Sequence, residues 1–378
     1  MKKLLAVILC LVLIGSLAAC GGGDKDKDAG DQGTTKGDTI YVLGPTPDHG
    51  WTAQAGTYAE AKVKDINAEG KYKAEYIPAS SGEEQVDQVN KIIADGNAAG
   101  VVFFALEDSA KAGQEALITE NIPFISFDRI IEGPDKSAIL NFSGDNWECG
   151  AAIAYWLQQK GLKPGDTLVT LIGDNGTVCS RRQEGFQEFL TGTREYHDKA
   201  TGQTYKTTQV WEQKDIDALQ AKYKTVCNWS ADGAYQYLEQ TIKDITADAK
   251  AAGGNLYVYS MDDEMTFGFM NLLEGNAIDS ATKTDLEGLK LYISAIGGMQ
   301  ELYDVMSGAS SQAKVADQYF DDMMSVYFSP KMMDSAINYM IQYLDNTDWT
   351  YAVGDGVYEP VWIVDRNNVK DYEGFTGH

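Results

Sequence analysis

From Thr39 onward the chain alternates short apolar runs with longer stretches in which apolar residues recur every three or four positions. Runs of four to six Val, Ile, Leu, Phe and Tyr residues are typical of strands buried on both faces of a sheet. The runs that predict strands are 40–43, 72–77, 101–105, 124–127, 138–142, 168–172, 256–259 and 291–296. The intervening stretches of helical period are 54–67, 83–94, 109–120, 146–160, 183–190, 231–247 and 264–274. This succession predicts an α/β fold with a parallel, doubly wound sheet.

A chain of 378 residues is long enough for two such domains. We therefore expect two doubly wound parallel-sheet lobes joined by hinge crossovers. The expected first lobe comprises 39–144 and 318–347, and the second comprises 145–317 and 348–378. The polar segment 191–209 interrupts the alternation and predicts a surface hairpin inserted in the second lobe.

The first 38 residues differ from the rest of the chain. A basic start is followed by 16 apolar residues, 4–19, fewer than the roughly 20 that a membrane-spanning helix needs, so 1–19 is predicted to be a secretory signal. The sequence Leu-Ala-Ala-Cys-Gly at its end resembles the lipobox of bacterial lipoproteins, which implies a lipidated Cys20. The alternative is an ordinary secretion signal with a chance cysteine. Residues 20–38 have almost no apolar side chains and predict a flexible, acidic tether.

The charge of the chain restricts its partners. A formal net charge of −25 repels phosphate backbones and anionic membrane surfaces, so we expect no nucleic-acid partner and membrane attachment through the lipid anchor alone. The sequence contains no CxxC, HExxH or GxxxxGK[ST] motif. We therefore expect no cofactor, no metal site and no enzymatic activity.

Polar and aromatic residues follow the predicted strands where open α/β sheets place their ligand crevice. Carboxylates accept hydroxyl protons, arginine donates in a fixed fork, and indole faces cover C–H surfaces. This chemistry suits an uncharged, polyhydroxylated ring. The candidate ligand-binding residues are Asp48, His49, Trp51, Asp128, Arg129, Arg182, Trp229, Asp262 and Asp317.

Five segments, in order, resemble the periplasmic-binding-protein type 1 family, in the branch that binds ribose, galactose, glucose, xylose and related sugars for ABC importers. They are 122–129, 145–150, 182–186, 262–268 and 357–368. The resemblance covers nearly the whole folded region. It implies a protein that captures a monosaccharide between two lobes, by hinge closure, and delivers it to ABC permease subunits.

The resemblance also implies individual roles. Asp128 and Arg129 would bind ring hydroxyls from the first lobe and Arg182 from the second, while Trp51 and Trp229 would stack on opposite faces of the sugar. Asp262 stands where the family usually has a ligand-contacting asparagine or aspartate, and Asp317 where it has an amide at a hinge. One position departs from the family: Ile296 stands where an acid is common, and Asp48 or His49 is the candidate substitute.

These expectations describe a monomeric lipoprotein on the extracellular face of the cell membrane, or in the periplasm of a Gram-negative source. The sequence leaves the identity of the sugar open. It also leaves two alternatives open: a sugar sensor that feeds a histidine kinase or chemoreceptor, and a secreted glycosidase that uses Asp128 and Asp262 as its two carboxyl groups.

Three cysteines, Cys149, Cys179 and Cys227, follow the tether. Cys179 and Cys227 each lie just before a predicted ligand residue of the second lobe, and an extracellular setting permits disulfides. The sequence leaves two alternatives open: a Cys179–Cys227 disulfide, or buried free thiols.

Overall fold

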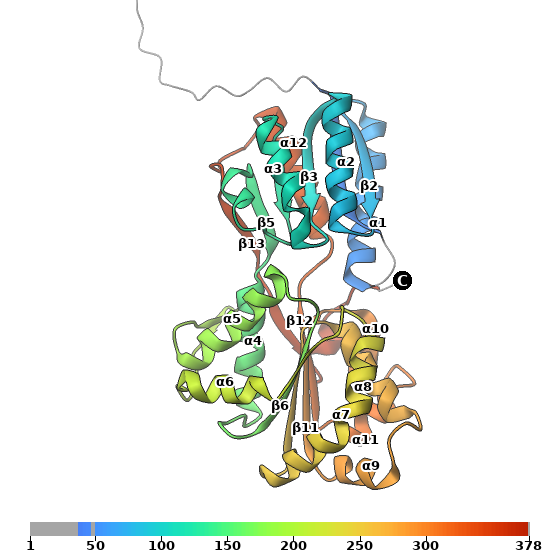
Figure 1. The fold of residues 1–378 in the computed structure, drawn as a ribbon, viewed down its shortest axis with the longest axis vertical. Coiled ribbons are helices and arrows are strands. Elements are labelled where there is room, and N and C mark those ends of the chain that lie inside the picture. Colours follow the sequence, from blue (N-terminus) through green and yellow to red (C-terminus); the bar gives the residue numbers. More distant parts are fainter. Residues whose placement is uncertain (1–36, 47–49, 377–378) are drawn as a thin grey trace, which may run out of the picture. The chain divides into compact units, whose positions relative to one another are not determined.

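The computed structural model of the chain describes residues 37–46 and 50–376, which form two six-stranded sheets and a short hairpin (Figure 1). The predicted signal peptide, the Cys20 anchor and the candidates Asp48 and His49 lie outside the described residues. No helix in the described part of the chain has the length and hydrophobicity that a membrane span requires.

The first sheet is entirely parallel, with the order β13-β5-β4-β3-β1-β2. Its strands are β1 (Thr39–Pro45), β2 (Lys73–Ala79), β3 (Ala98–Phe104), β4 (Phe124–Phe127), β5 (Leu140–Gly144) and β13 (Gly356–Glu359). Its helices are α1 (Gly50–Glu69), α2 (Gly82–Asp95), α3 (Lys111–Thr119) and α12 (Met332–Asp345), with short 3-10 turns at Asp108–Ala110 and Pro134–Ser137.

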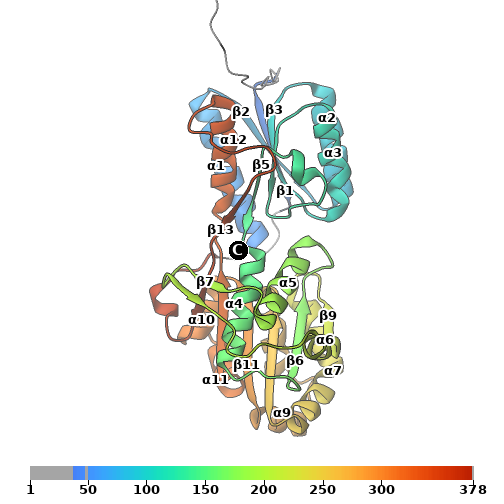
Figure 2. The same ribbon diagram turned by 90° about the vertical axis from the view of Figure 1, so that its left-hand side faces the viewer.

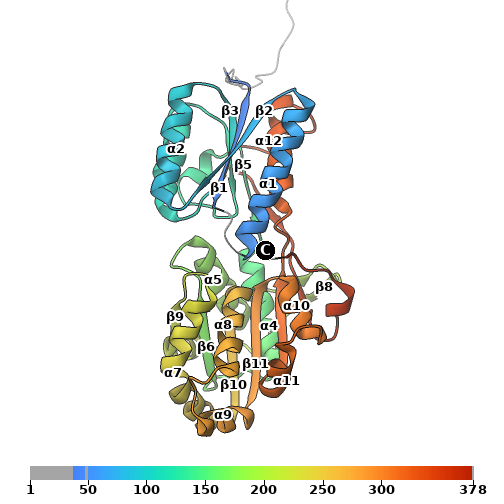
Figure 3. The same cartoon turned by 90° about the vertical axis from the view of Figure 1, so that its right-hand side faces the viewer.

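Helices cover both faces of the first sheet. Helices α1 and α12 lie on one side of this sheet and α2 lies on the other (Figure 3). Successive residues of a strand point to opposite faces, so Ile40 and Val42 pack with α1 and α12, while Tyr41 and Leu43 pack with α2 and α3. Because both faces are covered, the strands are apolar almost throughout, as the sequence pattern predicts. The sequence also encodes the ends of α2. The side chain of Ser81 accepts a hydrogen bond from the backbone N–H of Glu84, and Gly96 ends the helix in the left-handed conformation.

The second sheet has the order β14-β12-β11-β10-β6-β9, in which β14 alone is antiparallel to its neighbour. Its strands are β6 (Thr167–Ile172), β9 (Tyr223–Val226), β10 (Asn255–Ser260), β11 (Lys290–Gly297), β12 (Asp322–Tyr327) and β14 (Trp362–Asp365). Its helices are α4 (Asn146–Gln159), α5 (Thr177–Thr191), α6 (Gln213–Ala221), α7 (Ala231–Ala251), α8 (Asp263–Glu274), α9 (Ser280–Glu287), α10 (Gln300–Ser307) and α11 (Ala313–Tyr319), with a 3-10 turn at Val369–Asp371.

Helices α4, α5 and α6 lie on one side of this sheet, and α7, α8 and α10 lie on the other (Figure 1). The predicted hairpin is also present. Strands β7 (Tyr196–Asp198) and β8 (Gln203–Tyr205) pair in an antiparallel manner, and β7 lies alongside α4 (Figure 2). These observations confirm the predicted α/β fold of two doubly wound lobes.

Three connections in the described chain pass between the two sheets. They follow β5 at Gly144, follow β12 at Phe328, and join β13 to β14 through 360–361. The expected lobe boundaries therefore need correction in two places. Residues 318–328 belong with the second sheet, because β12 pairs there with β11. Residues 348–359 belong with the first sheet, because β13 pairs there with β5.

Candidate functional site

A cavity of about 260 Å³ lies where the carboxyl ends of strands from both sheets meet. The first lobe contributes residues that follow β1, β3 and β4, and the second contributes residues that follow β9 and β10 together with the first turns of α5. The wall residues that the following paragraphs use are Trp51, Asp128, Arg129, Arg182, Asn228, Trp229, Asp262, Gly297 and Phe328.

Asp128 presents a carboxylate to the cavity. Its backbone has a φ of 58°, and its N–H donates to the carbonyl of Phe142 over 2.9 Å. The carboxylate accepts no hydrogen bond from any described residue, so both of its oxygens remain available to a ligand. Burial raises the pKa of Asp128, and the nearby charges of Arg182 and Arg129 oppose this shift.

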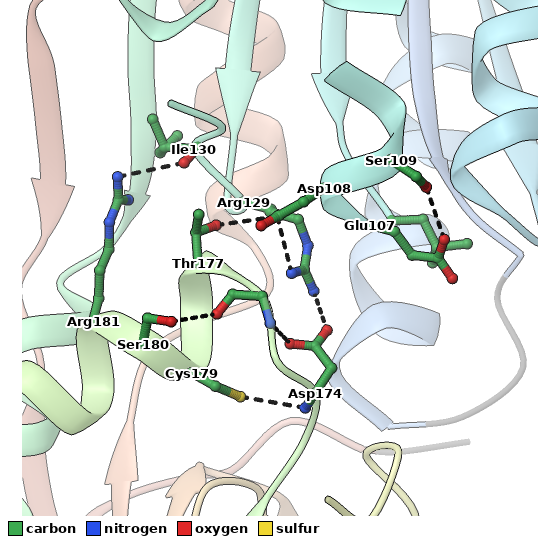
Figure 4. A network of polar contacts seen from close by, with 12 residues as sticks. Glu107, Asp108, Ser109, Arg129, Ile130, Asp174, Thr177, Cys179, Ser180 and Arg181 are labelled. Carbon is green, nitrogen blue, oxygen red and sulfur yellow. Dashed lines mark hydrogen bonds and ion pairs between the residues drawn. The ribbon is translucent and has the colours of Figure 1, made fainter. Parts of the chain in front are cut away.

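Arg129 follows Asp128, but its guanidinium already has protein partners. Its Nη2 lies 2.7 Å from Oδ2 of Asp174 in the second lobe, and its Nη1 lies 3.4 Å from Oδ1 of Asp108 (Figure 4). The Arg129 side chain is only 6% exposed. The geometry therefore makes Arg129 a link between the lobes as well as part of the cavity wall.

Arg182 is held in place by three elements of the second lobe. Its Nε donates to Oδ1 of Asn146 over 2.8 Å, and its Nη1 donates to the carbonyl of Met261. The guanidinium carbon lies 5.5 Å from the ring centre of Trp229 and 5.7 Å from that of Phe328, within cation–π range. No acidic side chain among the described residues lies within ion-pair distance of Arg182, although the carboxyl groups of Asp128 and Asp262 interact with its charge electrostatically.

Two glycines of the sequence motifs make this placement of Arg182 sterically feasible. A Cβ at Gly150 of α4 would lie 2.0 Å from the carbonyl oxygen of Arg182, and a Cβ at Gly185 of α5 would lie 1.8 Å from that of Trp147. The backbones of α4 and α5 can approach this closely only because both positions lack a side chain. This packing explains why glycine occurs at both positions.

Trp229 forms part of the aromatic wall. Both Asn228 and Trp229 have left-handed backbone, with φ of 52° and 56°. The indole lies against the backbone of Gly173, where a Cβ would come within 2.2 Å of the ring carbons, and its Nε1 donates to Oδ2 of Asp174 over 3.1 Å. The ring is therefore oriented by contacts that the sequence analysis did not identify.

Trp51, the second expected stacking residue, lies mostly inside an aromatic cluster. Its ring stacks on Phe127 at 6.3 Å and 19°, lies 5.1 Å from the ring of Phe328, and meets Phe104 edge-on. Its Nε1 donates to the carbonyl of Phe328 over 3.2 Å, and only 8% of the residue is exposed. Trp51 lines the cavity but offers little free surface.

Asp262 and Asp263 begin α8 and have different surroundings. Asp262 caps the helix by accepting a hydrogen bond from the N–H of Glu264 over 2.8 Å, and it lines the cavity. Burial, followed by the neighbouring charge of Asp263, raises the pKa of Asp262 well above its ordinary value. Asp263 is fully buried and does not line the cavity.

Asp263 organises the loop after β11 instead. Its Oδ2 accepts hydrogen bonds from the N–H groups of Gly298 and Met299 over 2.7 and 2.8 Å, and its Oδ1 accepts one from the hydroxyl of Ser325 over 2.7 Å. Burial raises its pKa to about 6, although these hydrogen bonds favour the charged form. Gly297, the last residue of β11, directly precedes this loop and lines the cavity; it follows Ile296 in the chain, the position that departs from the family pattern.

One sequence-based expectation needs correction, and one open alternative is decided. Asp317 does not lie at a hinge or in the cavity: it lies on α11, 67% exposed, with its Oδ1 3.1 Å from Nη1 of Arg366. Cys149, Cys179 and Cys227 are buried free thiols, so the structure has no Cys179–Cys227 disulfide. The Sγ of Cys179 instead accepts a hydrogen bond from the N–H of Asp174 over 3.4 Å.

The sequence analysis missed Asp174, Asn146, Asn228 and Phe328 as site residues. Asp174 follows the predicted strand 168–172 and satisfies the same strand-end rule that selected Asp128, so this signal was present. Phe328 follows β12, a strand that the apolar pattern did not reveal. No local signal distinguishes it from a core phenylalanine.

A model described as a periplasmic binding protein domain matches residues 40–348. A galactofuranose binding protein has a similar structure, with a TM-score of 0.64 and 16% identity over 88% of this chain and 96% of that chain. The periplasmic binding protein component of the arabinose ABC transporter from Shewanella sp. ANA-3 has a TM-score of 0.60 and 18% identity, over 88% of this chain and 93% of that chain.

The myo-inositol binding protein of Caulobacter gives a TM-score of 0.61 and 15% identity, over 88% of this chain and 95% of that chain. At these identities the structural likenesses show a shared fold. A search of the curated proteins finds no match.

Proposed function

Because the chain belongs to the periplasmic binding protein family, we propose that it captures a monosaccharide between its two lobes and delivers it to an ABC importer. The similar structures include binding proteins for galactofuranose, arabinose and myo-inositol, which are all uncharged polyols. The cavity volume of about 260 Å³ lies just below the range of roughly 300–1,000 Å³ that is usual for small-molecule sites, which suits a ligand as small as a monosaccharide.

The observation that carries the proposal is the set of polar atoms that face the cavity without a protein partner. The Asp128 carboxylate, one carboxylate oxygen of Asp262 and Nη2 of Arg182 make no hydrogen bond with the described residues. Hydroxyl groups both donate and accept, so one polyol can satisfy two acids and a guanidinium together. Buried polar groups that a wrong epimer leaves unpaired would supply the selectivity.

The balance of charge on the wall favours an uncharged ligand. Arg129 is paired with Asp174 and Asp108, which leaves the single positive charge of Arg182 opposite Asp128 and Asp262. A phosphate or carboxylate ligand would meet two acids for one arginine. Sugar phosphates and uronic acids are therefore expected to bind poorly.

Closure of the lobes is the proposed mechanism. A sugar in the cavity contacts groups from both sheets, so it favours the closed arrangement by the difference between its affinities for the closed and open forms. The connections at Gly144, Phe328 and 360–361 would bend while each lobe moves as a unit. The closed form would then be recognised by the permease subunits.

The cellular setting completes the proposal. We propose that 1–19 is removed as a signal peptide, that Cys20 carries the lipid, and that the monomeric protein works on the extracytoplasmic face of the membrane without catalysing a reaction. Two or more acyl chains hold a protein stably on a membrane, whereas one does not.

A thermal-shift screen tests the proposal. The panel is D-galactose, D-glucose, D-ribose, L-arabinose and myo-inositol, with glucose 6-phosphate as the charged counterpart. At least one neutral member is expected to raise Tm in proportion to the logarithm of its concentration, whereas the phosphate is not. The shift should be absent in Asp128→Ala and present in Trp349→Ala, which alters an aromatic residue outside the cavity. The proposal would be refuted if no neutral sugar of the panel raised Tm and if calorimetry also detected no binding.

A further inference from the structure

Asp174 makes hydrogen bonds to both lobes with one carboxylate. It lies in the turn between β6 and α5, where its Oδ1 accepts the N–H of Gly176 over 2.7 Å. Its Oδ2 accepts two further donors, Nη2 of Arg129 at 2.7 Å and Nε1 of Trp229 at 3.1 Å (Figure 4 shows the arginine and the turn). One carboxylate oxygen therefore connects a residue of the first lobe to an aromatic residue of the cavity wall.

The Arg129–Asp174 pair is shielded from water. The Arg129 side chain is 6% exposed and the Asp174 side chain 28% exposed, so solvent screens this ion pair less than a surface pair. Burial opposes the charge on Asp174, yet the charge of Arg129 and the hydrogen bonds from Arg129, Gly176 and Trp229 together outweigh it and keep the pKa of Asp174 below its ordinary value. Both partners are thus charged when the pair forms.

The neighbouring contacts between the lobes are weaker. The hydroxyl of Thr177 donates to Oδ1 of Asp108, and Nη2 of Arg181 donates to the carbonyl of Ile130, each over 3.4 Å (Figure 4). Both distances exceed the usual range for a good hydrogen bond. The ion pair is therefore the strongest polar link between the turn before α5 and the first lobe.

The backbone beside the pair is shaped to accept the guanidinium. A Cβ at Gly176 would lie 1.9 Å from Nη1 of Arg129 and 2.9 Å from Oδ1 of Asp174. Gly176 has a φ of −83°, which any residue can adopt, so conformational freedom does not explain the glycine. The absence of a side chain is what lets Arg129 reach Asp174.

We infer that Asp174 is a positioning residue for sugar binding, which fastens the lobes together through Arg129 and at the same time holds the Trp229 indole in place on the cavity wall. The inference rests on the proposed function. It reassigns Arg129: this arginine supports sugar binding through Asp174 instead of through a hydrogen bond to the sugar. Closure and orientation of the aromatic wall are then coupled, because the same oxygen serves both.

A double-mutant cycle tests the path through Asp174. Calorimetry would measure Kd for the tightest-binding sugar of the panel in Asp174→Asn, Arg129→Ala and the double variant. Asparagine has the size of aspartate but carries no charge, and its single acceptor oxygen cannot replace both carboxylate oxygens, which accept from Arg129 and Trp229 on one side and from Gly176 on the other. We expect each single change to weaken binding about tenfold, and the double variant to be within about twofold of the singles.

One outcome of this double-mutant cycle would contradict the inference. If Arg129→Ala weakens binding by the same factor with and without the Asp174→Asn change, Arg129 acts on the sugar directly and the inference is wrong. The variants must retain the wild-type unfolding transition, and Asp285→Asn, which removes an exposed ion pair with Lys250, is the matched control.

A second experiment needs no sugar and so separates this inference from the proposed function. Small-angle X-ray scattering of the ligand-free protein should give a larger radius of gyration for Arg129→Ala, Asp174→Asn and Gly176→Ala than for the wild type. Asp285→Asn should match the wild type. Identical radii for the wild type and all three variants would overturn the fastening role even if sugars bind. Larger radii without sugar binding would refute only the proposed function.

Discussion

At the scale of single residues, the cavity is built on backbone conformations that most side chains avoid. Asp128, Asn228 and Trp229 have φ of 58°, 52° and 56°, in the left-handed region. Asparagine and aspartate tolerate this region because they are short and polar, whereas a bulky aromatic residue there is an outlier. Such strain persists where the surroundings impose it, and Gly173 and Asp174 impose it on Trp229.

This strain gives a prediction that separates binding from folding. Trp229→Ala and Trp229→Gly should both weaken sugar binding at least tenfold, since each removes the indole. Trp229→Gly should nevertheless be more stable than Trp229→Ala by about 1 kcal/mol, because glycine adopts a positive φ without strain. Urea unfolding and calorimetry measure the two effects.

Asn346 provides the matched control, because it has a φ of 51° at the end of α12 and lies outside the cavity. Asn346→Gly and Asn346→Ala should differ in stability in the same direction and bind sugar like the wild type. Equal stability of the two Trp229 variants would contradict the interpretation of strain.

At the scale of elements, two of the connections between the sheets contact each other beside the cavity. The ring of Phe328 follows β12 and lies over Gly144 at the end of β5, where a Cβ would come within 2.8 Å of its Cδ2. The same ring packs on Trp51 and lines the cavity. The packing of the Phe328 ring therefore links the hinge to the ligand site.

Gly144→Ala should move this ring. We expect a loss of about 1–2 kcal/mol in the free energy of unfolding and a several-fold weaker affinity for the sugar, since an extra methyl group in a packed site forces its neighbours to shift. Gly113→Ala is the control: its Cβ would meet Val89 and Phe103 at 3.4 and 3.5 Å, an ordinary contact, so the helix should keep or gain stability. An unchanged affinity in Gly144→Ala would contradict this prediction, because it would show that the Phe328 ring shifts without altering the cavity.

At the scale of the whole molecule, buried acids around the cavity oppose the stability that the cores provide. Burial raises the pKa of Asp128, Asp262 and Asp263, the last to about 6. Burial makes the charged form of each carboxyl group unfavourable in the folded state, so each group lowers the free energy of unfolding when it is charged. A binding site that offers acids to hydroxyl groups therefore costs stability at neutral pH.

The pH dependence of unfolding should reveal this cost. Between the ordinary pKa of 3.8 and about 6, folded Asp263 holds a proton that unfolded Asp263 has released. Its contribution to the free energy of unfolding therefore falls as the pH rises through this window, by roughly 3 kcal/mol. Urea unfolding at pH 4.5 and 7.0 should show this decrease in the wild type and a smaller one in Asp263→Asn.

The exposed Asp317→Asn change is the control and should leave the wild-type pH dependence intact. The same pH dependence in Asp263→Asn as in the wild type would rule out Asp263 as its source.

Much of the fold follows from local sequence. Strands buried on both faces must be apolar along their length, so β1, β4, β6 and β11 are visible as continuous runs, and the helices between them are visible by period. The strand-end rule then brings Asp128, Arg182 and Asp262 to one cavity. These properties depend on residues close together in the chain.

The sequence by itself determined the α/β class, the presence of two lobes and most of the acids and aromatic residues of the cavity, because periodicity and strand ends are local. Only the tertiary structure decided that β12 belongs to the second sheet and β13 to the first, that Arg129 faces Asp174, and that Asp317 lies on the exposed face of α11. These outcomes depend on pairing between residues far apart in the chain, and on which donors and acceptors the fold brings within hydrogen-bond distance. No pattern within a few residues carries that information.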